Sequence, residues 1–452
     1  MRGFLQPATF VICWSGTFAV ISHDLDWLVT PERRVQAQAE QVSWGNIEQA
    51  ARRAVPGSDI DYMSAPLNRH AVAEVWLSHP DGVLAVVWVD PYTAEVTGSS
   101  HGFGLAEFFR GFHYRLFLPN LAGIPVGLYL VSVFALTMLA SMVAALVFYK
   151  RWWRRFLKGP RGRGRAFWSE LHKAVGLWSI WFLLVIGLTG GWYLYEGAQH
   201  DLFEGPLNYV DNAPIGVVSV PAPATAPALP ALPLDEVIAR AERAWPEFEI
   251  TTAAYGWYSG GEDAVYLQGH TGGFSLLRGR ANQMHLDPRS GEVLWQNGSG
   301  DLSPYWVWSN MADPLHFGNF AGLWSKAIWF VFGLLLSGLI LTGTWLHAQR
   351  LAREAGGRAR HRWPGTGAAI AVSLLVLAAS VPFGFQEARE YYGPTVNGVK
   401  QLPTLAPGVK AVIIGWIALT LVIIASWILV LWRPGLLMRT MRRNENWLWR
   451  LS

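Results

Sequence analysis

The sequence has very little cysteine: Cys13 is the only one among 452 residues. A single cysteine excludes an intramolecular disulfide, and it also excludes covalent c-type haem attachment, which needs a C-x-x-C-H motif. Charge is scarce too, because only 15% of the residues are charged whereas 52% are hydrophobic. Together with 25 Trp, this composition is typical of a membrane protein rather than of a soluble core.

Motifs of several enzyme classes are missing from the chain. It has no G-x-S-x-G elbow, no H-E-x-x-H, no P-loop and no Rossmann fingerprint. These absences argue against an internal nicotinamide or ATP site, so NAD(P)H or flavin would have to come on a partner. The net charge of +4 comes from loops beside apolar runs and is no sign of nucleic-acid binding.

Long apolar runs predict six membrane spans. Their approximate limits are Phe4–Ile21, Leu121–Tyr149, Val175–Tyr195, Leu323–Leu346, Thr366–Phe385 and Val409–Trp432. The first run has the length of a signal peptide, but Ser22–Asp26 follows it in place of a small-residue cleavage site. We therefore interpret it as a span.

The distribution of basic residues predicts the orientation. Lys150–Arg165 carries eight Lys and Arg and no acid, and Arg350–Arg362 and Arg433–Arg450 carry five each. With six spans these segments share one side, which the positive-inside rule makes cytoplasmic, together with both termini. Pro31–Phe112 and Glu196–His316 are acidic on balance and lie outside.

The two outer segments repeat one another. Segment 43–109 is typical of a small α/β domain, with a helix at Asn46–Ala54 and strands at Ala73–Ser78 and Val83–Val89. Segment 234–303 follows the same pattern, and its LDPRSGEV matches VDPYTAEV of the first copy. Each copy leads to a histidine and then to a span, which indicates an internal duplication.

These features predict a mixed membrane protein: an α-helical transmembrane bundle of about six spans with two small outer α/β domains. The predicted segments are a first transmembrane helix (1–30), an outer domain (31–112), the second and third helices with a basic loop (113–195), a linker and second outer domain (196–316), the fourth helix (317–350), and the fifth and sixth helices with a cytoplasmic tail (351–452).

Four of the 12 His lie beside spans: His113 and His316 on the outer side, His172 and His347 on the inner side. We interpret Pro314–Arg350 as one spanning helix with a histidine near each end. Paired positions favour ligation over simple placement in the membrane interface. Bundle cores build cofactor sites from facing helices, and haem b, whose iron accepts imidazole, is the economical candidate, as one or two haems that carry electrons across the bilayer.

Other residues are candidates for substrate binding. His23, just after the first span, could replace an outer ligand or contact a substrate. The second outer domain carries an insertion, Gly256–Gly273, that contains His270. Tyr255 and Trp257 lie beside or within it and offer aromatic faces for a bulky ligand such as a metal chelate.

The chain resembles the PepSY-associated transmembrane helix family of bacterial inner-membrane proteins over roughly residues 10–350. The resemblance rests on the two outer repeats, FFRGFH ending at His113, ELHKAVGLW around His172, and PLHFG around His316 through Thr342-Gly343. It implies two periplasmic PepSY-like domains in an inner-membrane protein, and bis-histidine haem b at the His113/His316 and His172/His347 levels. Family members also carry a histidine at the start of the first helix, which Met1–Phe10 lacks.

The family includes reductases that release iron from siderophores. The resemblance therefore implies an inner-membrane haem b reductase that passes electrons from a quinol or flavoprotein to a periplasmic ferric siderophore or other iron chelate. The alternative is a non-enzymatic PepSY module without a cofactor, which binds a peptide, protease or chelate for signalling or hand-over to a transporter. A third possibility, a transporter subunit, is weakened by the near absence of acidic residues inside the spans.

Overall fold

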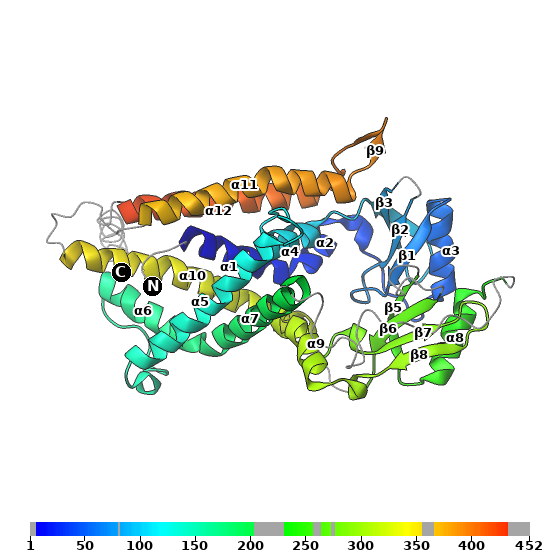
Figure 1. Ribbon diagram of the computed structural model, residues 1–452, viewed down its shortest axis with the longest axis horizontal. Helices are drawn as coiled ribbons and strands as arrows, with labels where there is room; N and C mark the ends of the chain where they lie inside the picture. Colours follow the sequence, from blue (N-terminus) through cyan, green and yellow to red (C-terminus); the bar gives the residue numbers. More distant parts are fainter. Residues whose placement is uncertain are drawn as a thin grey trace.

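The computed structural model describes residues 6–79, 82–202, 230–255, 264–272, 276–354 and 366–432. It has two parts, a bundle of long helices and a β-sheet domain at one end of the bundle (Figure 1). We call this end of the bundle the sheet end and the opposite one the far end. Trp257, most of the predicted linker and the predicted basic tail lie outside the described residues.

The bundle consists of ten of the described helices. They are α1 (Gln6–Val20), α2 (Ser22–Val29), α4 (Leu105–Arg115), α5 (Val126–Phe148), α6 (Arg165–Trp178), α7 (Ile180–Leu202), α9 (Pro304–Phe317), α10 (Gly322–Glu354), α11 (Thr366–Tyr392) and α12 (Pro407–Trp432). Among the described residues, α5, α10, α11 and α12 are each long and apolar enough to cross a membrane. Two bent pairs, α1 with α2 and α6 with α7, raise the number of spans to as many as six.

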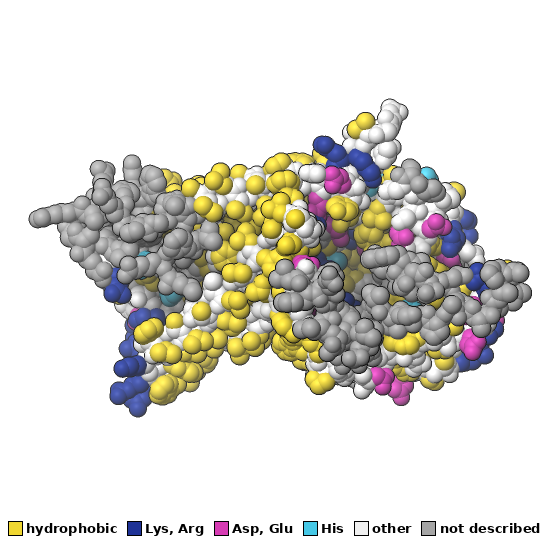
Figure 2. All heavy atoms as spheres, viewed as in Figure 1, with side chains coloured by type: hydrophobic (Ala, Val, Ile, Leu, Met, Phe, Trp, Pro, Cys, Tyr) yellow, Lys and Arg dark blue, Asp and Glu magenta, His cyan; other side chains and the backbone are white. Residues whose placement is uncertain are grey.

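The surface of the bundle fits a lipid environment. Figure 2 shows hydrophobic side chains across the exposed bundle, with Lys and Arg gathered at the far end and mixed charges on the sheet domain. Many large apolar residues of α5 and α12 are exposed, including Val147 at 64% and Leu421 at 62%. Such a broad apolar surface is typical of contact with lipid. The chain is therefore a multi-pass membrane protein.

Two predicted helices are interrupted. The predicted span Val175–Tyr195 is wrong at its start, because α6 ends at Trp178 and α7 leaves at an angle of 60°. The predicted helix Pro314–Arg350 is also wrong, because α9 ends at Gly318, which has φ 65°. A residue in the left-handed backbone conformation often ends a helix, and glycine adopts this conformation without strain. His172 and His316 thus lie on short helices of their own.

The sheet domain is a single antiparallel sheet of eight described strands in the order β4-β3-β2-β1-β5-β6-β7-β8. The strands are β1 (Asp59–Ser64), β2 (Ala73–Ser78), β3 (Leu84–Val89), β4 (Val96–Ser100), β5 (Glu249–Ala254), β6 (Val265–His270), β7 (Gln283–Leu286) and β8 (Val293–Asn297). The central pairing of β1 with β5 joins the two predicted outer domains into one sheet.

Helices α3 (Trp44–Ala54) and α8 (Leu234–Ala244) cover one face of this sheet and bury a shared apolar core with it. The other face looks toward the bundle (Figure 1). Each half has the order helix and then four strands, and each closes the same turn: Asp90 N–H donates to Glu95 O at 2.8 Å, and Asp287 N–H donates to Glu292 O at 2.9 Å.

Helices α11 and α12 pack along the bundle against α1, α4 and α10. A short hairpin of β9 (Thr395–Val396) and β10 (Val399–Lys400) joins them near the sheet domain (Figure 1). Arg115 of α4 donates to Glu387 of α11 at 2.5 Å, and Trp14 Nε1 of α1 donates to Thr420 Oγ1 of α12 at 2.9 Å. The last two helices are therefore tied to the core of the bundle by polar as well as apolar contacts.

Candidate functional site

A cavity of about 1660 Å³ runs through the bundle between α1, α5, α7 and α10. Small-molecule sites typically occupy about 300–1,000 Å³, so this space exceeds what one small ligand needs. Its described lining residues are mostly apolar, but they include His113, His316 and His172. The cavity thus collects three of the four histidines that the sequence predicted as ligands.

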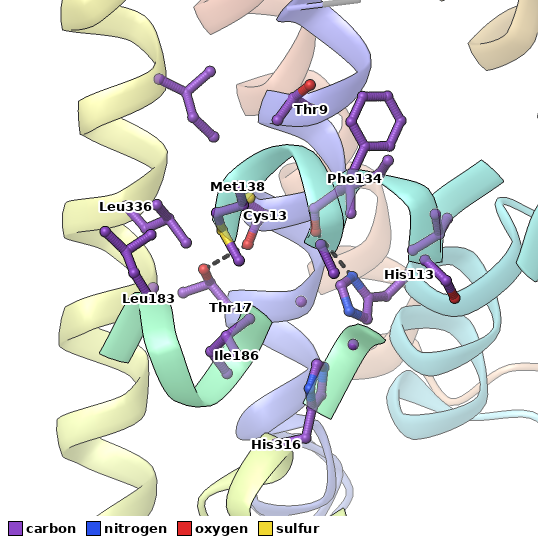
Figure 3. A pocket seen from close by; sticks show the side chains of 18 of the residues that line it. Thr9, Cys13, Thr17, His113, Phe134, Met138, Leu183, Ile186, His316 and Leu336 are labelled. Atoms are coloured by element: carbon purple, nitrogen blue, oxygen red, sulfur yellow. Dashed lines mark hydrogen bonds between the residues drawn. The ribbon is translucent and has the colours of Figure 1, made fainter. Parts of the chain in front are cut away.

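His113 of α4 and His316 of α9 form a close pair at the sheet end of the cavity. Their ring centres lie 6.1 Å apart and their planes are tilted by 35°. Figure 3 shows both rings pointing toward the same space. Metal–nitrogen bonds of about 2 Å, with each ring centre about 1.1 Å behind its nitrogen, put the ring centres of two imidazoles on opposite sides of one metal ion about 6.2 Å apart. The pair therefore has the spacing of two axial ligands.

Hydrogen bonds fix the tautomer of both rings. His113 Nδ1 lies 2.9 Å from the carbonyl oxygen of Ile12, which can only accept, so Nδ1 carries the proton. His316 Nδ1 lies 2.8 Å from Thr189 Oγ1, whose own proton goes to the carbonyl oxygen of Val185 at 2.8 Å. The hydroxyl must therefore accept from His316. In both rings the Nε2 lone pair is left for a metal ion, the arrangement usual for ligating histidines.

Gly16 of α1 provides the room for His113. A Cβ at this position would lie 2.6 Å from Cε1 and 2.8 Å from Nδ1 of that ring. Real Cβ contacts are longer, so a larger residue would push the imidazole away. Burial also lowers the pKa of His113, and burial together with the neighbouring His113 lowers the pKa of His316 to about 3. Both imidazoles are therefore neutral at pH 7, as a metal ligand must be.

His172 of α6 lies at another part of the same cavity, against α10. Its Nδ1 is 2.9 Å from Thr342 Oγ1, which donates its own proton to the carbonyl oxygen of Gly338 at 2.7 Å. His172 Nδ1 is then the donor, and its Nε2 lone pair is available. A Cβ on Gly343 would lie 3.0 Å from Cε1 of His172. A Thr-Gly pair thus supports His172 with the same chemistry that Thr189 provides for His316.

The other predicted ligands lie elsewhere. His347 is exposed on α10 and is not among the residues described as lining the cavity. His23 is exposed on α2, with Nε2 3.4 Å from Nη1 of Arg110, a cavity-lining residue whose guanidinium stacks on Phe317 at 4.9 Å. His23 therefore lies beside the sheet end of the cavity rather than in it.

The structure does not bring the predicted substrate residues together. His270 pairs with Glu249 at the first end of β5, whereas Tyr255 follows the other end. Six residues of strand separate these ends by about 20 Å. Tyr255 packs against the apolar core beneath α3 and α8, away from the face that looks toward the bundle. Trp257 lies outside the described residues.

Sequence reasoning missed a row of aromatic residues across the sheet. Strand register aligns Trp76 with Tyr62, Tyr266 with His285, and His285 with Trp295. Tyr62 and Trp76 stack with ring centres 5.4 Å apart, and His285 contacts Tyr266 and Trp295 at 4.9 and 5.4 Å. Their chain neighbours face α3 and α8, so this aromatic row lies on the face toward the bundle. The sequence signal for this aromatic row was the alternation of side chains between the two faces along each strand.

A polar contact connects the sheet domain to the helix of His316. Arg278, after β6, pairs with Asp313 of α9, and its Nε donates to Asn310 Oδ1 at 3.2 Å. Asp313 also accepts from Tyr193 at 2.6 Å and lies one helical turn before His316. The sheet domain thus contacts the short helix that carries His316.

Comparisons with known proteins agree with this architecture. A family model described as "PepSY-associated TM region" matches residues 4–350. The chain is also similar to an uncharacterized protein of Pseudomonas aeruginosa, PA4219, with 27% identity over 266 residues. The match covers 55% of this chain and 64% of that relative, so the chain spans less than two thirds of the relative's length.

Proposed function

The chain belongs to the PepSY-associated TM family, and from this premise we propose that it is a haem b reductase that passes electrons through the bundle to a ferric chelate at the sheet domain. The observation that carries the proposal is the pair His113 and His316. Two neutral imidazoles with free Nε2 lone pairs, 6.1 Å apart in a cavity, form a donor set for one haem iron.

The cavity supports a second haem at the level of His172. Trp329 of α10 donates to the carbonyl oxygen of Leu315, next to His316, at 2.8 Å, and Thr342 of the same helix contacts His172. Thirteen helical residues between these levels span about 20 Å. Haem, when bound, supplies the one-electron redox chemistry. The protein orients the imidazoles, keeps them neutral and surrounds them with apolar walls.

Cationic side chains lie beside both levels. Arg110 is one turn before His113 on α4, and Lys173 follows His172 on α6; both line the cavity. Either cation pairs well with a carboxylate such as a haem propionate, because charge-assisted hydrogen bonds gain strength in an apolar surrounding. We propose that Arg110 and Lys173 pair with the haem propionates. The proton of each imidazole stays on Nδ1 throughout.

The sheet domain is the proposed site for the chelate. Its aromatic row faces the bundle, and Arg278 joins it to the helix of His316. We infer two PepSY-like halves that arose by duplication, placed in the periplasm of a bacterial inner-membrane protein. The basic far end is then cytoplasmic and receives electrons from a quinol or flavoprotein. Reduction releases iron, because a hard oxygen chelator favours Fe(III) over Fe(II).

Visible spectra of the detergent-purified protein, with a pyridine haemochrome assay for stoichiometry, test the proposal. We expect b-type haem in the wild type and loss of a low-spin bis-histidine signal in His316→Ala. His270→Ala, which changes an exposed histidine of the sheet domain, is the matched control and should keep every haem signal. Absence of haem from wild-type protein made with ample haem supply would refute the reductase and favour the non-enzymatic binding module.

A further inference from the structure

The loop between α5 and α6, residues 149–164, combines basic and exposed apolar side chains at the far end of the bundle, and we call it the basic loop. Eight Lys and Arg and no acid lie between Lys150 and Arg165, both included. In the same loop Trp153 is 61% exposed and Leu157 is 92% exposed. Figure 2 shows Lys and Arg beside hydrophobic side chains at this end. Neither kind of side chain takes part in the proposed electron transfer, so the loop is a candidate for a separate role.

The basic loop is fixed against α6. Arg155 Nη1 donates to Glu170 Oε2 of α6 at 3.0 Å. Trp178 Nε1, at the end of α6, donates to the carbonyl oxygen of Phe156 at 2.8 Å. Two contacts with α6 thus hold adjacent residues of the loop, so its exposed side chains keep a defined position.

The basic loop lies at the level where the hydrocarbon core of a membrane ends. Helix α5 has 23 residues, which span about 34 Å, close to the roughly 30 Å of a hydrocarbon core. Phe148 at its end is 83% exposed, and the loop begins at the next residue. Phospholipid headgroups lie directly outside the hydrocarbon core. Trp is enriched at this level, because its ring is apolar while its N–H group is polar.

Most cations of the basic loop need a negative charge from elsewhere. Arg155 pairs with Glu170 of α6. Within the part of the chain that the structure describes, no ion pair involves Lys150, Arg151 or Arg154, and all three are exposed. Phosphate oxygens accept strong charge-assisted hydrogen bonds from such groups. The headgroup layer supplies phosphates at the level of the loop.

We propose that the basic loop binds the headgroups of anionic phospholipids, with Lys150, Arg151 and Arg154 on the phosphates and with Trp153 and Leu157 at the boundary to the acyl chains. Clusters of Lys and Arg beside a membrane span bind acidic headgroups, and burial of apolar side chains at the boundary strengthens the interaction. A lipid surface fits better than a soluble acidic protein, because the exposed apolar side chains continue the lipid-facing surface of α5. The interaction is independent of haem.

A fluorophore at Leu157 tests this directly. Leu157→Cys is labelled with an environment-sensitive dye in a Cys13→Ala background, which removes the one native cysteine. The full-length protein, purified in detergent, is titrated with phosphatidylglycerol or with phosphatidylcholine in the same detergent. We expect a blue shift of the emission with phosphatidylglycerol at concentrations where phosphatidylcholine gives none.

Paired substitutions show whether charge decides the binding. Arg151→Ala with Arg154→Ala should weaken phosphatidylglycerol binding about 30-fold, since each cation near a membrane surface contributes about fivefold. Arg151→Lys with Arg154→Lys keeps both charges and should bind as the wild type does. Arg53→Ala with Arg243→Ala removes two exposed arginines of the sheet domain and is the matched control, which should also bind as the wild type does.

Amide hydrogen exchange measures the effect of the lipid on α6, the helix that carries His172. Phosphatidylglycerol should slow exchange in α6 of the wild type relative to phosphatidylcholine, because Glu170 and Trp178 connect this helix to the basic loop. The variant with Arg151→Ala and Arg154→Ala should lose the difference between the two lipids.

Other outcomes overturn the inference. Equal affinity for the two lipids, or phosphatidylglycerol binding that survives Arg151→Ala with Arg154→Ala, would mean that the basic loop does not select anionic headgroups. A blue shift with inorganic phosphate that matches the shift with phosphatidylglycerol would indicate a site for a free anion. A shift that needs purified flavodoxin and occurs without phospholipid would make the loop a docking surface for a protein. None of these results bears on the haem proposal, which the pyridine haemochrome assay tests.

Discussion

The carboxylate of Asp26 in α2 accepts hydrogen bonds from the backbone N–H groups of Leu105 and Ala106, at 2.8 and 2.9 Å. These residues begin α4, and Asp26 is only 1% exposed. The first N–H groups of a helix lack partners within it and favour a negative charge. Asp26 therefore acts as a remote N-cap for the helix that carries His113, and it fixes where that imidazole lies.

Asp26→Ala should destabilise the protein and weaken the His113/His316 site together. Loss of an N-cap costs about 0.5–2 kcal/mol. We expect a lower Tm and a reduced low-spin haem content, measured by thermal unfolding in detergent and by the pyridine haemochrome assay. Asp26→Asn keeps one acceptor oxygen, so its Tm and its low-spin haem content should lie between those of the wild type and those of Asp26→Ala.

The matched control for this prediction is Ser43→Ala in the sheet domain. Ser43 caps α3, where its Oγ accepts from Asn46 N–H at 3.3 Å. This variant should lose a similar amount of stability and keep its full haem content. Equal loss of haem from both variants would show that general destabilisation, and not the position of α4, decides haem retention.

Gly16→Ala should displace the ring of His113. The added Cβ would lie 2.6 Å from Cε1, which is too close for any real contact. Alanine is about 1 kcal/mol better than glycine in a helix, so a loss of low-spin haem cannot be assigned to helix propensity. Absorption and electron paramagnetic resonance spectra should show a weakened or altered bis-histidine signal, with any signal of the haem proposed at the His172 level unchanged.

Gly338→Ala gives the comparison for Gly16→Ala. Gly338 lies within α10, and a Cβ there meets no atom within 4 Å. The two variants make the same chemical change in two helices of the bundle, but only one affects a histidine. A normal low-spin spectrum in Gly16→Ala would mean that His113 can move and still fill its proposed role as a metal ligand.

Much of the bundle was predictable from the sequence. Apolar length alone predicted the four helices α5, α10, α11 and α12, because a span needs about 20 apolar residues and few other segments have them. The breaks at Ser179 and Gly318 were missed, since apolar periodicity continues across them. Only the left-handed φ of Gly318 and the 60° bend after Trp178 reveal that His316 and His172 lie on short helices separate from α10 and α7.

The histidine set was predictable in part. The motifs around His172 and His316 carried the family resemblance that implied shared chemistry, and the structure gives both histidines the same Thr support. The role of Thr189 and Thr342 depends on contacts between residues 127 and 170 positions apart, which spacing does not encode. For the same reason His347 matched the pattern although it does not line the cavity.

Glu107 should contribute stability that is lost as the pH rises from about 5 to 8. This residue begins α4, accepts from Gly104 N–H at 2.8 Å, and lines the cavity. Burial, and then the nearby Asp26 carboxylate, raise its pKa from 4.5 to about 7. Between these values the folded protein holds a proton that the unfolded chain has lost, so the unfolding free energy decreases with rising pH and levels off above pH 7.

Glu107→Gln removes this titration and keeps an acceptor for Gly104. In thermal unfolding scans, the Tm of Glu107→Gln minus the Tm of the wild type should increase from pH 5 to pH 8. Glu236→Gln, which changes an exposed carboxylate of α8, should follow the wild type at every pH. Parallel curves for wild type and Glu107→Gln would show that Glu107 does not titrate in this range.

Arg278→Ala should loosen the contact between the sheet domain and α9. Its guanidinium pairs with Asp313 and Asn310, and loss of a hydrogen bond to a charged group costs about 1.5–3 kcal/mol. We expect faster amide hydrogen exchange in α9 and after β6, with haem content retained, because His316 keeps Thr189. Reduction of a ferric chelate by the pre-reduced protein should become slower, since the proposed chelate surface is no longer held against the histidine pair.

Arg240→Ala isolates the effect of the contact from that of the charge. Arg240 pairs with Glu236 on the outer surface of α8, so its loss removes one arginine from the same domain without touching α9. The rate at which Arg240→Ala reduces a ferric chelate should equal that of the wild type, and so should its rate of amide hydrogen exchange in α9. Exposed ion pairs contribute little to stability. If both variants slowed chelate reduction equally, positive charge on the domain would attract the chelate, and the Arg278–Asp313 contact would have no separate part in electron delivery.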